Sequence, residues 1–212
     1  MKTQDLIGRL AQDPRPAAPP VRQQLHRALL GSALVCGAAL LLFWGVNPDL
    51  DTMLTHPAFA TKMLWLLAMT FFSGRGLLRL SRPGMDAGAS FQGLLFALLA
   101  MACLGLIQSL QSSPDSRMAL WLGGSWQTCA LSIVALSLPV LAALIWTLRQ
   151  LAPTRPALAG AAAGAMAGCI AASFYSMHCT ETALAFFTAW YGGSIVAMSA
   201  LGALLGQRAL RW

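Results

Sequence analysis

The chain has 212 residues, of which 57% are hydrophobic and 10% charged, and its net charge is +7. Soluble domains carry roughly 25% charged residues, so this composition excludes an ordinary soluble domain and predicts a membrane protein. Alternation of apolar and polar residues with a period of two is absent, which argues against a β-barrel. The predicted fold is therefore all-α and polytopic.

A polar segment of 27 residues precedes the first apolar stretch. Met1–Asp13 is predicted to form a short helix with Asp5 in its first turn, where a carboxylate suits the helix dipole. The prolines of Pro14–Pro20 end this helix and predict a stiff, extended spacer. We therefore expect residues 1–27 to form a small cytoplasmic head.

One narrow apolar face runs along the predicted head helix, formed by Leu6, Ile7 and Leu10. A helix of this length is marginal alone in water, so the face needs a partner. It could lie on lipid headgroups, with Arg9 near the anionic surface. It could instead dock into a groove of a soluble protein. The spacer slightly favours docking, because it separates the helix from the bilayer.

Six apolar stretches follow, each near the ~20 residues that a helix needs to cross a bilayer. Residues 28–206 are therefore predicted to form a bundle of six transmembrane helices, and residues 207–212 a cytoplasmic tail. The predicted crossings are Ala28–Val46, Ala58–Leu77, Ala89–Leu110, Trp126–Leu148, Ala157–Met177 and Ala183–Leu204.

The basic residues are distributed unevenly between the two sides of these crossings. Twelve of the fourteen fall on the side of the N-terminus, and only Lys62 and Arg117 fall on the other. This positive-inside pattern predicts both termini in the cytoplasm, and in a bacterium such a helical protein lies in the inner membrane. The excess of basic residues is therefore explained by the orientation of the chain in the lipid bilayer. We expect no direct binding of nucleic acid.

Small residues fill the fifth predicted crossing, where Gly160, Gly164 and Gly168 are spaced four apart. This small-xxx-small pattern lets another backbone approach closely. Packing inside the bundle is the favoured interpretation, with Gly202 and Gly206 of the last crossing as possible neighbours. A homodimer through the same face is the alternative.

The five cysteines divide into two groups. Cys36, Cys103 and Cys169 lie well inside apolar crossings and are interpreted as small hydrophobic residues. Cys129 and Cys179 instead fall at one level near the outer ends of the crossings, on the side that is oxidising in bacteria.

Cys129 and Cys179 could form a disulfide, share a soft metal ion as thiolates, or be unrelated. Their spacing does not decide, since they lie on different helices. His178 and Glu181 could add ligands or change the thiol pKa, and His56 could reach the same face. We expect no obligatory cofactor; where the pair shares a metal, the ion is expected to be a transiently bound heavy metal.

Catalytic motifs are missing from the sequence, and the middles of the crossings carry almost no ionisable groups, unlike those of transporters and pumps. The chain is therefore predicted to be a sensor or regulator and not an enzyme. The alternatives are a small metal-handling membrane transporter and a structural membrane subunit with incidental cysteines.

Four segments together resemble the bacterial six-helix membrane anti-sigma factors of the negative-regulator-of-sigma-F (NrsF) type. The segments are Met1–Ile7 (MKTQDLI), Ser125–Cys129 (SWQTC), Ala152–Gly160 (APTRPALAG) and His178–Glu181 (HCTE) followed by Phe186–Tyr191 (FFTAWY). The resemblance covers nearly the whole chain.

The resemblance implies that the chain sequesters an extracytoplasmic-function sigma factor through its N-terminal segment. It also implies release of that sigma factor when a heavy metal or oxidant acts through two periplasmic cysteines, which match Cys129 and Cys179. The candidate sigma-binding residues are Asp5, Leu6, Ile7 and Leu10.

Overall fold

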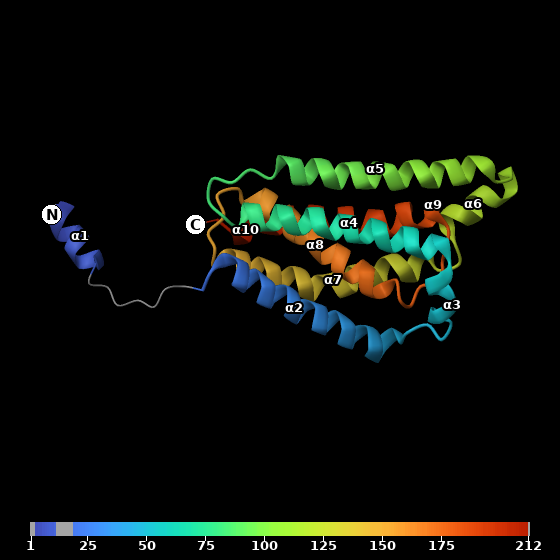
Figure 1. Cartoon of the computed structure of the whole chain (residues 1–212), viewed down its shortest axis with the longest axis horizontal. Helices are drawn as coiled ribbons and strands as arrows, with labels where there is room; N and C mark the ends of the chain where they lie inside the picture. The colour runs from blue at the N-terminus through green and yellow to red at the C-terminus, as the bar shows by residue number, and fades with distance from the viewer. Residues whose placement is uncertain (1–2, 12–18, 212) are drawn as a thin grey trace.

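The computed structural model describes residues 3–11 and 19–211, and within them every regular element is a helix. Figure 1 shows long helices side by side in a bundle, which confirms the predicted all-α fold. Six helical segments are long and apolar enough to cross a membrane: Val21–Trp44, Pro57–Leu80, Gly88–Gln111, Pro114–Arg149, Pro156–Tyr175 and Leu184–Ala209.

The long segments divide into the following elements in chain order. The first consists of α2 (Val21–Ala39) and the wider π-helical turns of η1 (Leu40–Trp44). The next four are α4 (Pro57–Leu80), α5 (Gly88–Gln111), α7 (Trp126–Arg149) and α8 (Pro156–Tyr175). The last is built from α9 (Leu184–Phe186), the π-helical η2 (Phe187–Gly192) and α10 (Gly193–Ala209).

Three short helices accompany the bundle elements: α1 (Thr3–Ala11), α3 (Leu50–Thr55) and α6 (Pro114–Leu122). The head helix predicted over Met1–Asp13 is thus present as α1. Of the predicted spacer Pro14–Pro20, residues 14–18 lie outside the described part of the chain. α2 begins at Val21, whereas the first crossing was predicted to begin at Ala28. Residues 21–27, predicted as the end of the head, therefore belong to the first helix of the bundle.

Proline fixes where several helices begin. Pro57, Pro114 and Pro156 each open a helix, at a position whose missing N–H would have had no intrahelical partner. In front of α4, the Nδ1 atom of His56 accepts a hydrogen bond from the backbone N–H of Ala58 at 3.2 Å. These signals explain the sharp starts of the helices.

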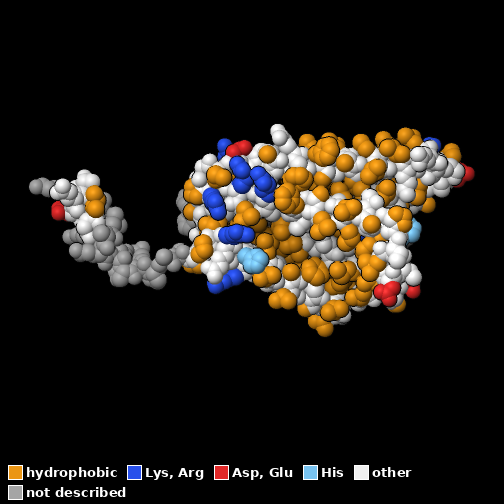
Figure 2. All heavy atoms as spheres, viewed as in Figure 1, with side chains coloured by type: hydrophobic (Ala, Val, Ile, Leu, Met, Phe, Trp, Pro, Cys, Tyr) orange, Lys and Arg blue, Asp and Glu red, His pale blue; other side chains and the backbone are white. Residues whose placement is uncertain are grey.

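The bundle has two chemically different ends. The chain enters α2 and leaves α10 at the same end (Figure 1), and Figure 2 shows lysine and arginine side chains gathered there. We call it the basic end. Acidic side chains mark the opposite end, which carries α3, α6 and the connection between α8 and α9.

The tightest packing joins α8 to α10. A Cβ atom on Gly160 would lie 2.1 Å from the carbonyl oxygen of Gly202, and one on Gly164 would lie 2.0 Å from that of Met198. No side chain fits there, so the two backbones touch directly. Gly168 lies on the same face of α8. The glycine face of α8 therefore packs against α10 of the same chain.

Candidate functional site

Two cysteines meet at the end opposite the basic end. Cys129 lies in the first turn of α7, and Cys179 lies in the connection between α8 and α9. Their thiols are neighbours, and both are free. The structure therefore brings together the two cysteines whose relation the sequence spacing leaves open.

Burial distinguishes Cys179 from most residues of connecting segments, which are usually exposed. Its side chain is 4% exposed, and that of Cys129 is fully buried. Cys179 forms part of the wall of a cavity of about 500 Å³, together with Trp44, Tyr175 and His178. Cys129 does not line this cavity, so a reagent entering it meets Cys179 first.

Lys62 lies beside this pair, from the second turn of α4. Its side chain is fully buried, and its Nζ atom has no hydrogen-bond partner in the described part of the chain. Nζ lies 4.8 Å from the ring centre of Phe187, 5.1 Å from that of Phe59 and 5.7 Å from that of Tyr191. Such cation–π contacts partly replace the water that a buried ammonium loses.

The charged or ionisable groups near the Lys62 ammonium are Cys179, Cys129 and Glu181. A buried charge without a counter-charge is costly, so an anionic thiol pair would stabilise the lysine. Sequence reasoning counted Lys62 only as a basic residue on the outer side. Phe59 lies three residues earlier on the same face of the helix. This spacing in the sequence already indicated an aromatic neighbour for Lys62.

The adjacent Cys129 thiol lowers the pKa of Cys179. The nearby Tyr191 hydroxyl, the backbone N–H of Glu181 and the Lys62 ammonium act in the same direction, while burial opposes them. The Tyr191 hydroxyl approaches Cys179 without forming a hydrogen bond of ordinary geometry. Cys179 thus becomes a thiolate at a lower pH than a free cysteine.

Glu181 and His178 hold the connection that carries Cys179. Glu181 Oε1 accepts hydrogen bonds from the backbone N–H of Gly124 at 2.8 Å and from the Ser125 hydroxyl at 3.2 Å, just before α7. His178 Nδ1 lies 3.2 Å from the carbonyl oxygen of Gly45, at the end of η1. These contacts give both side chains a positioning role.

A metal ion at this site would have few ligands. The described residues contain no group of three or more His, Cys, Asp or Glu side chains placed to hold a metal. His56 caps α4 and lines a separate cavity of about 230 Å³ with Glu181. The two sulfur atoms of Cys129 and Cys179 fit only a soft ion that accepts two thiolates.

The other three cysteines lie apart from this site. The Cys36 thiol donates to the carbonyl oxygen of Leu136 at 3.6 Å, Cys169 is fully buried in α8, and Cys103 is exposed on α5.

Comparisons with known proteins agree along the whole chain. The family described as NrsF, negative regulator of sigma F, matches residues 10–212. A probable anti-sigma-F factor NrsF from Azospira oryzae is 36% identical over 214 residues, covering all of both chains. The anti-sigma-F factor NrsF of Caulobacter vibrioides is 35% identical over 218 residues, again covering all of both. No solved structure matches this chain. The chain therefore belongs to the NrsF family of anti-sigma factors, the negative regulators of sigma F.

Proposed function

We propose that this chain holds an extracytoplasmic-function sigma factor at the membrane and releases it when a heavy metal or an oxidant reacts at Cys129 and Cys179. The observation that carries the proposal is the meeting of these thiols at the end of the bundle opposite the basic end. A signal outside the cell would reach the thiols, and the sigma factor would bind the N-terminal segment inside.

The orientation in this proposal follows from charge. Among the described residues, the arginines of α2, α4, α7 and α10 and those of the connections before α5 and α8 lie at the basic end, which suits the cytoplasmic face of an inner membrane. The cysteine pair then lies in the periplasm, an oxidising compartment. Both termini lie in the cytoplasm.

The chemistry starts at Cys179. A thiolate is both the nucleophile toward oxidants and the ligand for soft metals, and the lowered pKa of Cys179 favours this form. A two-electron oxidant would take two electrons from the Cys179 thiolate and the Cys129 thiol, which loses its proton, and leave a disulfide between them. A thiophilic ion would instead be bridged by the two sulfur atoms.

Both reactions change the charge that faces Lys62. A disulfide carries no negative charge, and a divalent ion bridged by two thiolates, after Cys129 loses its proton, is neutral overall. In either case Lys62 loses its counter-charge in a buried aromatic environment, which is strongly unfavourable. The packing around α4 then has to change, and this shift provides the driving force for release.

The reacting connection is also tied to its neighbours. Glu181 links it to the start of α7, and His178 links it to the end of η1. α4 extends from Lys62 to the basic end of the bundle. A displacement of α4 at the cysteine site would therefore move a helix that reaches the side of the sigma factor.

The N-terminal segment supplies the binding element. α1 is only nine residues long, and such a helix needs a partner to be stable. Ile7 is 60% exposed on it. The apolar face formed by Leu6, Ile7 and Leu10 would lie in a groove of the sigma factor, with Asp5 in the first turn.

Pull-down of the full-length protein from membranes, with the tagged sigma factor as bait, tests this role. We expect capture of the wild-type chain and of Ile7→Leu, which keeps an apolar side chain. Deletion of residues 1–13, or Ile7→Glu, should abolish capture while the protein stays in the membrane. Undiminished capture of the deletion variant would contradict the proposal.

A further inference from the structure

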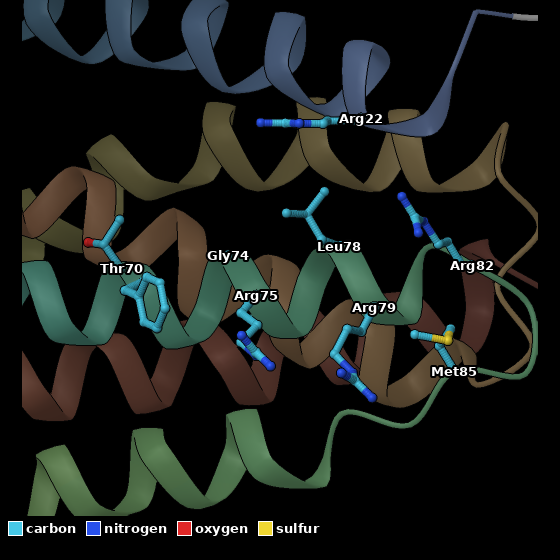
Figure 3. Close-up of a pocket in the computed structure, with 9 residues that line it drawn as sticks. Arg22, Thr70, Gly74, Arg75, Leu78, Arg79, Arg82 and Met85 are labelled. Carbon is cyan, nitrogen blue, oxygen red and sulfur yellow. The ribbon is translucent and has the colours of Figure 1, made fainter.

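A third cavity lies at the basic end, far from the cysteines in the fold. It has a volume of about 570 Å³, within the range of ligand pockets. Arg22 on α2, Arg75 and Arg79 on α4, and Arg82 in the connection after α4 all line it (Figure 3). None of these arginines takes part in the site described above.

The described part of the chain does not balance the positive charge of this cavity. Asp86 is the one acidic side chain at the basic end among residues 19–211. Its carboxylate is already engaged, with Arg155 at 3.0 Å and with the backbone N–H of Gly88 at 3.0 Å. Arg79 reaches only the backbone carbonyl of Asp86. The other three arginines of the cavity form no ion pair with a described residue.

An apolar surface adjoins the arginines. Phe71, Leu78 and Met85 line the same cavity, and Phe71 is 61% exposed. Leu67 and Leu64 continue the row from Phe71 along one face of α4, away from the basic end, at 64% and 68% exposure. Their spacing at intervals of three and four residues places them on one helix face. This face is long, apolar and uncovered in the described structure.

We infer that the cavity binds one anionic phospholipid, with its phosphate among Arg22, Arg75 and Arg82 and its acyl chains along Leu64–Phe71. Guanidinium groups match phosphate oxygens in charge and geometry. Basic pockets between transmembrane helices on the cytoplasmic side are suited to anionic headgroups. An acidic protein segment would satisfy the arginines but would leave the apolar row uncovered. The inference goes beyond sigma binding and does not depend on it.

Lipid titration of the purified full-length chain tests the inference. The protein is held in phosphatidylcholine mixed micelles, and phosphatidylglycerol with the same acyl chains is added while thermal unfolding is followed by tryptophan fluorescence. We expect phosphatidylglycerol to raise the unfolding temperature and extra phosphatidylcholine to leave it unchanged. Native mass spectrometry should show one phosphatidylglycerol molecule retained.

Two double variants locate the effect. Arg75→Gln with Arg82→Gln should bind the lipid about 30-fold more weakly, a change of about 2 kcal/mol. Arg149→Gln with Arg208→Gln removes the same charge from the basic end outside the cavity and should bind as the wild type does. If the cavity variant fails to fold, the retained lipid in the wild-type mass spectrum decides the question.

Three outcomes would overturn the inference. Equal loss of binding in both double variants would show attraction to general surface charge. Protection by inorganic phosphate at the same concentration would show a phosphate site without lipid. Protection by a polyglutamate peptide, but not by phosphatidylglycerol, would assign the cavity to an acidic protein segment.

Discussion

Replacing Lys62 with methionine should leave the bundle folded and make Cys179 less reactive. Methionine has nearly the length of lysine and can occupy the same space between Phe59, Phe187 and Tyr191. The substitution removes only the ammonium group, whose charge favours the Cys179 thiolate.

The expected change in stability is small because two effects oppose each other. Methionine avoids the desolvation cost of a buried ammonium, and Cys179 can take up a proton, so that no unpaired charge stays buried. The lost cation–π contacts cost about 2 kcal/mol. We therefore expect the free energy of unfolding of Lys62→Met to change by less than about 2 kcal/mol.

The expected change in reactivity is larger. The Lys62 ammonium is one of several groups that favour the Cys179 thiolate, so losing its charge raises the pKa of Cys179. Thiolate exists above the pKa, so its onset moves to higher pH. Below the pKa of the wild-type thiol, each unit reduces the thiolate population, and hence the alkylation rate, about tenfold.

The assay uses a background in which Cys36, Cys103 and Cys169 are alanine, so that only the pair can react. The rate of alkylation by iodoacetamide is measured from pH 5 to pH 9 in lipid nanodiscs. Lys62→Arg keeps the charge and should keep reactivity at low pH. Identical pH profiles for the parent and Lys62→Met would refute the reasoning that Lys62 is the counter-charge of the thiols.

Two further predictions concern the packing and the positioning contacts. Gly164→Leu places a Cβ atom 2.0 Å from the Met198 carbonyl oxygen, so we expect a loss of about 3 kcal/mol or more in thermal unfolding, whereas Gly193→Ala, with no atom within 4 Å, should be neutral. A stable Gly164→Leu protein would contradict the packing of α8 on α10. Glu181→Ala removes two hydrogen bonds before α7 and should cost about 2 kcal/mol, while Asp115→Ala on exposed α6 should change stability by less than about 0.5 kcal/mol. Equal effects of these two substitutions would show that Glu181 does not hold the connection.

Apolar run length makes the six long helices predictable, because a helix that crosses a bilayer needs a nearly uninterrupted apolar stretch. The close approach of α8 and α10 is also visible in sequence, since Gly160, Gly164 and Gly202 leave space that only a backbone fills. Both features depend on local composition and spacing.

The candidate site depends on contacts between distant segments, and these are not encoded in local patterns. Cys129 and Cys179 come from different helices, and Glu181 binds a turn 57 residues earlier in the chain. In the sequence, Lys62 looks like an ordinary basic residue on the outer side of the membrane. Tertiary packing nevertheless buries it among aromatic rings from α4 and η2. The chemistry of the thiols therefore became apparent only with the fold.

The central claim is that the cysteine pair at one end of the bundle controls sigma-factor binding at the other. The direct measurement is the affinity of the full-length protein in nanodiscs for its sigma factor, before and after treatment with diamide or a mercury(II) salt. We predict that treatment weakens binding by at least tenfold in the wild type and leaves the affinity of Cys129→Ser with Cys179→Ser unchanged. An equal loss of affinity in the double variant, or none in the wild type, would contradict the account.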